Sequence, residues 1–455
     1  MKRLPLSLLA HWAEGELHGD DAVVGALTQD TRALMPGSLY VALRGDRFDG
    51  HDFAYDAAMR GASALLVEHP VAVELPQIVV ANSELALARI ATAIQLENQA
   101  KVVAITGSNG KTSVKTLVLS ILQRAGVTYA NPGNRNNEIG LPLAVIDAPE
   151  DADFCIYEMG AGKPGDIRYL TDIVNPDVAL VNNVAAAHLE RMGSLLGVAT
   201  TKGAIYQALG DKGVAIINAD DAFGEFFADM AGERRIVRFA LDASADVSAR
   251  DIELDHAGSR FTLVTPQGES VVNLQLPGRH SVLNALAAAA VAMACGVSLV
   301  TIAEGLAAAQ PVPGRQIAHR LANGAVLVDD SYNANPGSLQ AAIGTLASSG
   351  AEAWLVLGDM RELGDDAIAL HAEAGRQAKA AGLRRLYALG ELSAHAAQAF
   401  GEGGQVFDSH QSLSQALRAD LHAGVRCLVK GSRGSAMDRI VAALLAEKEN
   451  KHHAA

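Results

Sequence analysis

Residues 101–122 combine residue types and spacing that suit the binding of a nucleotide phosphate. The stretch reads KVVAITGSNGKTSVKTLVLSIL. Gly107 and Gly110 would let backbone N–H groups turn toward one anion, and a helix that begins behind them would present its positive end to that anion. Lys111 could then reach the outer phosphates, while Thr112 could place its hydroxyl on Mg²⁺. We therefore predict a phosphate-binding loop made of Gly107, Ser108, Asn109, Gly110, Lys111, Thr112 and Ser113.

This loop departs from the strict pattern G-x-x-x-x-G-K-[ST], because Ile105 holds the place of the first glycine. The shortened form G-x-x-G-K-T is weak evidence when it stands alone. Its setting strengthens it, since an apolar β-rich run ends at Thr106 and a periodic apolar segment continues without a helix breaker until Gly126. A glycine-rich turn that binds nothing is the alternative.

Two more predicted strands carry polar residues where they end. FCIYEMG ends at Glu158, and DVALVNNV runs into AAAHLE, which contains His188. Because open α/β sheets bind ligands at the carboxyl ends of their strands, we expect both residues near the phosphate loop, with Glu158 as a candidate Mg²⁺ ligand. A structural hydrogen bond is the alternative for His188. Lys202 lies on a predicted helix, VATTKGAIYQAL, and the pattern alone gives it no role.

The first 97 residues contain two polar loops between strand and helix signals. One holds Asp30, Thr31 and Arg32, and the other, GDRFDGHD, holds Asp49, Gly50 and His51. These residues are too polar for a core. They could bind an anionic ligand, with Arg32 or Arg44 on phosphate, or they could form a solvated rim.

The chain is too long for one core, so we expect three α/β domains. Residues 1–97 would form a small domain and residues 98–311 a central domain with a parallel sheet around the phosphate loop. After the Pro/Gly hinge at 311–314, four strand signals alternate with Ala-rich helical stretches. This alternation predicts a doubly wound, Rossmann-like third domain over residues 312–455, without a G-x-G-x-x-G motif after its first strand.

Composition narrows the classes of partner. The net charge of −14 argues against a nucleic-acid or anionic-membrane surface. The first residues show no signal peptide, and the longest apolar run, 285–297, is too short to span a membrane. We expect a soluble cytoplasmic protein with small-molecule partners. Cys155, Cys295 and Cys427 are too far apart for a zinc pattern and are expected to be reduced core residues.

The chain resembles the Mur ligase family, and its motifs are most similar to those of the dipeptide-adding members. The matching stretches run over nearly the whole chain: DTRALMPGSLYVALRGDRFDGHDF, TGSNGKTS, NRNNEIGLPL, NNVAAAHLE with KGAIY, GRHSVLNALAA, DDSYNANPGSL, LGDMRELG and LVKGSRGSAMD. The shortened phosphate loop is also what this family has. One departure is Gly162-Lys163, where many relatives carry an Asn-His pair; if that pair touches substrate, specificity could differ.

The resemblance implies an ATP-dependent amide ligase of peptidoglycan precursor synthesis. UDP-N-acetylmuramoyl-tripeptide would be activated by ATP as an acyl phosphate, and the amine of D-alanyl-D-alanine would displace phosphate to give the pentapeptide. A monomer that uses ATP and Mg²⁺, with two metal ions, is expected. Whether the tripeptide ends in diaminopimelate or lysine stays open.

The resemblance also implies roles for single residues. Lys111, His188 and Lys202 would be catalytic, with Lys202 carbamylated. Thr112, Glu158 and His188 would hold metal. The remaining residues form two sets: Asn284, Arg315, Asp330, Asn333 and Asn335 at ATP, and Asp30, Thr31, Arg32, Asp49, Gly50, His51, Asn137 and Glu138 along the UDP-linked substrate.

Three alternative functions are open. Another amino-acid-adding ligase of the family is the nearest, although the Asp-Asn-Pro-Arg signature of the diaminopimelate-adding relative is absent. A conformational switch ATPase would hydrolyse ATP without an acceptor and an amine. A nucleotide-binding scaffold would leave Glu158, His188 and Lys202 without function.

Overall fold

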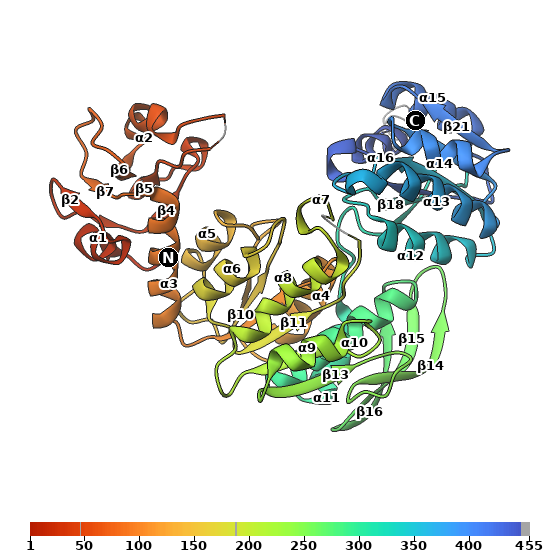
Figure 1. Cartoon of the computed structure of the whole chain (residues 1–455), viewed down its shortest axis with the longest axis horizontal. Coiled ribbons are helices and arrows are strands. Elements are labelled where there is room, and N and C mark those ends of the chain that lie inside the picture. Colours follow the sequence, from red (N-terminus) through yellow and green to blue (C-terminus); the bar gives the residue numbers. More distant parts are fainter. Residues whose placement is uncertain (46, 187–188, 447–455) are drawn as a thin grey trace, which may run out of the picture.

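The computed structural model describes residues 1–45, 47–186 and 189–446. Its elements form three bodies in a row, with the N-terminal part at one end, the C-terminal part at the other and the phosphate-loop part between them (Figure 1). Each body contains a sheet of five or six strands with helices packed on it. The predicted three-part α/β fold class is confirmed, while the boundaries 1–97, 98–311 and 312–455 stay predictions.

The N-terminal part is built on a five-stranded sheet in the order β2-β7-β6-β5-β4. Its polar loops form short 3-10 turns at the ends of β4 and β5, over 31–33 and 50–53. The strands are β1 (Leu4–Pro5), β2 (Glu16–His18), β3 (Val23–Val24), β4 (Ala26–Thr28), β5 (Ser38–Val41), β6 (Ala62–Val67) and β7 (Gln77–Val79). The helices are α1 (Leu6–Ala13), α2 (Ala54–Met59) and α3 (Ser83–Glu97).

The central part contains a six-stranded parallel sheet in the order β13-β12-β11-β8-β10-β9 and a three-stranded antiparallel sheet, β14-β15-β16. Its strands are β8 (Lys101–Thr106), β9 (Thr128–Ala130), β10 (Phe154–Glu158), β11 (Val178–Val181), β12 (Val214–Asn218), β13 (Arg235–Phe239), β14 (Ser248–Leu254), β15 (Ser259–Thr265) and β16 (Gly268–Leu274). Its helices are α4 (Lys111–Leu122), α5 (Gly140–Ile146), α6 (Asp166–Val174), α7 (Leu189–Met192), α8 (Leu195–Gln207), α9 (Gly224–Ala231), α10 (Arg279–Ala294) and α11 (Leu299–Ala308).

Both faces of the central sheet are buried, because alternate residues of each strand point to opposite sides. Val103 and Ile105 of β8 pack with α4, α10, α11 and the antiparallel sheet. Val102 and Ala104 face the other way, into a core shared with α5, α6, α8 and the N-terminal helices α1 and α3. The first part is therefore joined to the central part by a common apolar core as well as by the chain.

The phosphate loop follows β8, which lies between β11 and β10. Chain connections leave β8 toward both sides of the sheet, so a crevice opens at the carboxyl ends of these three strands. Glu158 is the last residue of β10, and Asn182 directly follows β11. The strand ends thus lie where the sequence pattern predicts them.

One segment differs from expectation. The turn-rich run NPGNRNNEIGLP over residues 131–142 predicts a loop, but the loop ends at Ile139 and α5 begins at Gly140. Pro142 is tolerated there because the first turn of a helix needs no N–H donor for an intrahelical bond.

The C-terminal part contains a six-stranded sheet in the order β17-β18-β22-β19-β20-β21, parallel except for β17. The repeated strand and helix signals of the sequence correctly predicted this doubly wound arrangement. Its strands are β17 (Ile317–Arg320), β18 (Val326–Asp330), β19 (Glu352–Gly358), β20 (Arg385–Leu389), β21 (Gly404–Phe407) and β22 (Val425–Lys430). Its helices are α12 (Pro336–Ala347), α13 (Ala367–Ala380), α14 (Ser393–Phe400), α15 (His410–Asp420) and α16 (Asp438–Leu445).

The cysteines are expected to be reduced core residues, and no membrane-spanning segment is expected. All three cysteines are free, with Cys155 and Cys427 buried and Cys295 partly buried. Burial raises the pKa of Cys155 to about 11, which keeps this thiol protonated at neutral pH. Within the described part of the chain, no helix is both long and apolar enough to cross a membrane.

Candidate active site

The phosphate loop has the backbone geometry that its glycines predict. Gly107 and Gly110 both have positive φ angles, +146° and +78°. A Cβ on Gly110 would lie only 2.5 Å from Asn182 Nδ2 and 2.6 Å from Asn284 Oδ1, so a larger residue would displace the loop. Lys111 opens α4, and its Nζ donates to the Gly107 carbonyl oxygen at 2.7 Å. Burial lowers the Lys111 pKa, against the opposing charge of Glu158.

Amide side chains fix this loop to the end of β11. Asn182 Nδ2 donates to the Asn109 carbonyl oxygen at 3.0 Å and to Asn284 Oδ1 at 2.9 Å. Asn183 Oδ1 accepts from the Asn109 backbone N–H at 2.8 Å. Asn182 Oδ1 is buried without a hydrogen-bond partner among the described residues. Neither Asn182 nor Asn183 was predicted as a site residue, although the pair NN directly after a strand was the available signal.

Glu158 is a buried carboxylate with a buried cation beside it. It is 3% exposed, and its Oε2 lies 3.2 Å from the Nζ of Lys115, which is 6% exposed. Asn136 Nδ2 donates to the other carboxylate oxygen at 3.1 Å. Burial alone would raise the Glu158 pKa, but the charges of Lys115 and Lys111, with the Thr112 hydroxyl, lower it below its usual value. Glu158 is therefore a carboxylate at neutral pH.

Lys115 was not predicted as a site residue. It lies four residues after Lys111 and thus on the same face of α4, which was the only signal in the sequence. Its Nζ also donates to the carbonyl oxygens of Asn131 at 2.9 Å and Gly133 at 3.3 Å. Lys115 thereby ties three segments together: α4, the loop after β9 and the end of β10.

The surroundings of Glu158 suit a divalent cation. Its Oε2 has no partner with hydrogen-bond geometry in the described structure, even though Lys115 is within ion-pair distance. Thr112 supplies a hydroxyl next to it. An oxygen donor set of this kind is what Mg²⁺ prefers. Among the described residues, no group of three or more His, Cys, Asp or Glu side chains could hold a metal, and the third predicted ligand, His188, lies outside the described residues.

Lys202 is the most deeply buried lysine of this region. It is 1% exposed on α8, and no carboxylate among the described residues lies within ion-pair distance of it. Burial, and then the nearby charge of Lys111, lower its pKa well below the usual value, against a smaller opposite effect of Asp166. Burial therefore favours the neutral amine of Lys202 over its ammonium more than in an exposed lysine.

The C-terminal part contributes cations and amides to the same site. Arg315 Nη2 donates to Thr112 Oγ1 at 3.0 Å, and the guanidinium lies over the Tyr332 ring, 4.5 Å from its centroid. Arg315 Nε is buried without a partner in the described structure. The predicted residue Arg315 is thus held against the phosphate loop by a hydrogen bond and against Tyr332 by a cation–π contact.

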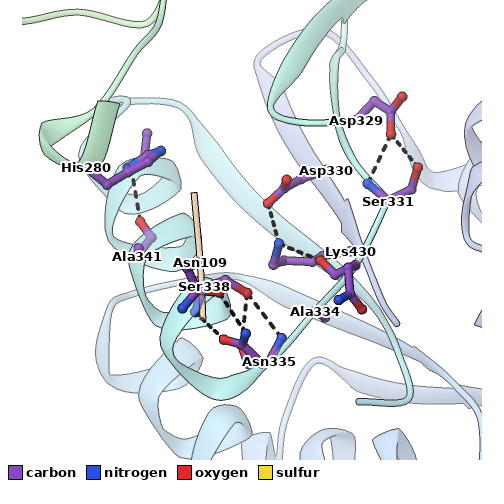
Figure 2. A network of polar contacts seen from close by, with 12 residues as sticks. Asn109, His280, Asp329, Asp330, Ser331, Ala334, Asn335, Ser338, Ala341 and Lys430 are labelled. Atoms are coloured by element: carbon purple, nitrogen blue, oxygen red, sulfur yellow. Dashed lines mark hydrogen bonds and ion pairs between the residues drawn. The ribbon is translucent and has the colours of Figure 1, made fainter. Parts of the chain in front are cut away.

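Figure 2 shows how two other C-terminal residues are held. Asn335 Nδ2 donates to Asn109 Oδ1 at 2.7 Å, while the Asn335 carboxamide oxygen accepts from the Ser338 backbone N–H and caps α12. Asp330, at the end of β18, pairs with Lys430, at the end of the neighbouring strand β22, at 2.6 Å. Lys430 also donates to the Asn333 carbonyl oxygen at 3.0 Å. Sequence reasoning missed Lys430, although its strand-end position was visible.

These residues surround one cavity of about 710 Å³ between the central and C-terminal parts. Most of the predicted ATP-site residues line it, together with the predicted substrate residues Asn137 and Glu138. Gly107, Thr112 and Lys202 are not among its lining residues. The predicted residues that line the cavity are Ser108, Asn109, Gly110, Lys111, Ser113, Asn137, Glu138, Glu158, Asn284, Arg315, Asp330, Asn333 and Asn335.

The N-terminal loop residues do not line this cavity. Asp30 forms a bidentate pair with Arg32, which lowers the Asp30 pKa to about 2. The buried ring of His51 uses Nδ1 toward Asp49 at 2.5 Å and accepts the Glu68 backbone N–H on Nε2 at 2.8 Å. The His51 ring therefore fixes the conformation of its own loop by these hydrogen bonds. Whether the polar loops of this region bind a ligand or form a solvated rim stays open.

The Lys115–Glu158 contact predicts that substitutions of these two residues have non-additive effects on stability. Lys115→Met should lower the local free energy of unfolding by about 3 kcal/mol, because it leaves Glu158 buried without its nearest cation. Adding Glu158→Gln should recover part of that loss, so the two changes would be non-additive by about 1 kcal/mol or more. Hydrogen exchange of the β8 and β10 amides across a urea series measures this. The exposed Lys212→Met is the matched control, and additive effects would contradict the coupling.

Three models of Mur ligase domains match successive parts of the chain. Residues 105–292 match the Mur ligase middle domain, residues 314–433 the Mur ligase glutamate ligase domain, and residues 24–108 the Mur ligase family catalytic domain. These three matches together cover most of the chain.

Relatives and solved structures match over nearly the full length. The chain is 43% identical to the UDP-N-acetylmuramoyl-tripeptide--D-alanyl-D-alanine ligase of Escherichia coli, over 98% of this chain and 99% of that protein. MurF from Acinetobacter baumannii superposes with a TM-score of 0.93 at 32% identity, covering 98% and 99% of the two chains. MurF ligase from Thermotoga maritima, solved in complex with ADP, gives 0.84 at 26% identity, covering 94% and 98%. The chain therefore belongs to the Mur ligase family.

Proposed function

We infer that this chain is an ATP-dependent ligase that joins D-alanyl-D-alanine to UDP-N-acetylmuramoyl-tripeptide, giving UDP-N-acetylmuramoyl-pentapeptide, ADP and phosphate. The observation that carries this inference is the full-length similarity to ligases of that name, at 43% identity to the Escherichia coli protein. The cavity supports it, because a phosphate loop, a buried carboxylate and several cations lie around one space of the size typical of a small-molecule site.

The reaction must first bring two anions together. A carboxylate oxygen of the tripeptide attacks the γ-phosphorus of ATP, and the bond to the leaving ADP oxygen breaks. Lys111 and the backbone N–H groups of the loop lie where they can offset this negative charge. The amine of D-alanyl-D-alanine then attacks the acyl carbon and loses a proton, and phosphate leaves with its bonding electrons.

We propose the ATP site on the geometry around the phosphate loop. Gly107 to Ser113 would hold the phosphates, with Arg315 beside Thr112 near the outer ones. Asn284 supports the loop through Asn182. Asp330, Asn333 and Asn335 line the C-terminal side of the cavity, where they would contact the ribose or base.

We propose Thr112 and Glu158 as Mg²⁺ ligands, with His188 at a second ion. When bound, Mg²⁺ would neutralise phosphate charge. The buried Oε2 of Glu158, which lacks a hydrogen-bond partner in the described structure, supports this. Lys115 and Asn136 would hold the carboxylate in place before a metal binds.

Lys202 is proposed to carry a carbamate. Only a neutral amine adds CO₂, and the addition releases one proton and leaves a carboxylate on Nζ. The lowered pKa of the buried Lys202 ammonium favours this reaction. The Lys202 ammonium has no carboxylate partner among the described residues. The carbamate would put an anion beside Lys111 in its place.

We propose that the acceptor runs from the N-terminal part to the phosphate loop. Asp30, Thr31, Arg32, Asp49, Gly50 and His51 would lie at the uridine nucleotide, and Asn137 with Glu138 would line the channel to the cavity. Residues 1–97 would then bind the acceptor and residues 98–311 would bind ATP. Residues 312–455 would move to close the cavity over both. A cytoplasmic monomer that supports cell shape and division, without nucleic-acid or membrane partners, completes the proposal.

The decisive test is phosphate release from ATP and Mg²⁺. We expect release only when UDP-N-acetylmuramoyl-tripeptide and D-alanyl-D-alanine are both present. Lys111→Ala should abolish it, because the phosphates lose their nearest cation, whereas the exposed Lys212→Ala should keep the wild-type rate. Release without either substrate would indicate a switch ATPase, and release with a different amino acid would indicate another ligase of the family.

The metal assignment makes a separate prediction. Glu158→Gln should raise the Mg²⁺ concentration for half-maximal rate by at least about tenfold, because the substitution keeps the shape of the side chain and removes its charge. Titration calorimetry of Mg²⁺ with a non-hydrolysable ATP analogue should show the same loss of affinity. An unchanged Mg²⁺ response would remove Glu158 from the metal site.

The carbamate can be observed directly. Wild-type protein equilibrated with ¹³C-bicarbonate should show a carbamate carbon signal by NMR, and the signal should vanish on acidification as CO₂ leaves. Lys202→Arg should lack the signal, because a guanidinium does not add CO₂. A signal that persists in this variant, or none in the wild type, contradicts the assignment.

A further inference from the structure

One edge of the cavity contains polar groups to which, apart from Glu138, the proposed function gives no role. It is formed by the loop after β10, the start of α6, the segment after β9 and α7. We call it the Lys163 edge, and its cavity-lining residues are Glu138, Gly162, Lys163, Asp166, Tyr169 and Arg191.

The loop that carries Lys163 is held in one shape. Asp166 Oδ2 accepts hydrogen bonds from the backbone N–H groups of Gly162 at 2.8 Å and Lys163 at 2.9 Å. Arg191 lies against the same loop, since its Nη1 would be 3.8 Å from a Cβ built on Gly162. Two cations from different elements therefore line the same edge of the cavity, with one oxygen of the Asp166 carboxylate occupied by the backbone.

These groups lack partners within the described structure. Lys163 and Arg191 are both exposed and line the cavity, and no carboxylate of the described residues lies within ion-pair distance of either. The Tyr169 hydroxyl oxygen is buried there without a hydrogen-bond partner. A buried hydroxyl without a partner is unfavourable and calls for a ligand or an ordered water.

Negative charge is present at this edge too. Glu84 of α3 interacts electrostatically with Glu138 and Lys163. Burial and then the charge of Glu138 raise the Glu84 pKa, and the charge of Lys163 lowers it. Burial and then the charges of Glu84 and Glu138 raise the Tyr169 pKa, so this hydroxyl lies on the glutamate side. The edge thus offers cations for a carboxylate, and glutamates with a hydroxyl for an ammonium. A group that carries both charges on one carbon matches it.

The edge is also near the reacting centre. Lys163 follows Glu158 by five residues, so the two Cα atoms are at most about 18 Å apart. The acceptor's terminal carboxylate must reach the phosphate loop for the proposed ligation. The side chain that branches from that same residue is then the part of the acceptor able to reach the Lys163 edge.

We propose that Lys163 and Arg191 select an acceptor whose third residue ends in a carboxylate and an ammonium, as diaminopimelate does, over one that ends in the amine of lysine. This inference rests on the proposed ligation. The two third residues differ by one carboxylate, so the cations are the residues that discriminate between them.

The test compares KM for three tripeptide acceptors that end in diaminopimelate, in lysine, or in diaminopimelate amidated on the distal carboxyl. The wild type should show a KM about tenfold lower for the first than for the other two, as expected for a charge-assisted hydrogen bond. Lys163→Met and Arg191→Met should each raise the KM for the first acceptor toward that of the other two. The KM values for ATP and D-alanyl-D-alanine should not change.

Arg168→Met is the matched control, because Arg168 is an exposed residue of the same helix α6 that pairs with Asp172 and does not line the cavity. It should leave all three KM values unchanged. Equal wild-type KM values for the three acceptors, or variants that raise all three alike, would overturn the proposal. Absence of turnover with every acceptor would instead overturn the ligation itself, and the selectivity with it.

Discussion

The contact between Lys115 and Glu158 is the interaction on which the rest of the site depends. Glu158 must stay ionised although it is almost fully buried, and burial of a lone carboxylate strongly favours its protonated form. Lys115 provides the nearest compensating charge at 3.2 Å. Because Lys115 also bonds to the carbonyl oxygens of Asn131 and Gly133, the same ammonium fixes the loop that carries Asn136. Electrostatics and loop geometry therefore cannot be changed independently here.

The C-terminal part completes the cavity by polar contacts and not by a large apolar interface. Asn335 and Arg315 each donate one hydrogen bond to the phosphate loop, to Asn109 and Thr112. The apolar cores of the C-terminal sheet are separate from the two cores of the central sheet. An interface with few hydrogen bonds and no shared apolar core costs little free energy to break. This suits a domain that must open for substrates and close around them. The N-terminal part differs, since it shares an apolar core with the central sheet.

Much of this arrangement was predictable from local sequence patterns. Glu158 could be placed because a β-rich run ends there, and parallel strands bring their ends to one edge. The doubly wound C-terminal sheet followed from repeated strand and helix signals. Lys115 could not be placed in the same way, since a mid-helix lysine normally extends to solvent and its burial depends on a loop that reaches it from 131–133. The groups of the Lys163 edge come from three segments, around 138, 162–169 and 191, and no local pattern shows that these segments meet at one cavity.

The contact of Lys111 with its own loop has a consequence for product release. Its Nζ donates to the Gly107 carbonyl oxygen at 2.7 Å, so the ammonium is hydrogen-bonded even without a phosphate. A departing nucleotide therefore exposes no unsatisfied cation, because the loop carbonyl takes the place of a phosphate oxygen. The nucleotide gains only the difference between the two contacts, which weakens the hold on ADP. An enzyme that must exchange its nucleotide in every cycle benefits from a lysine with a ready alternative acceptor.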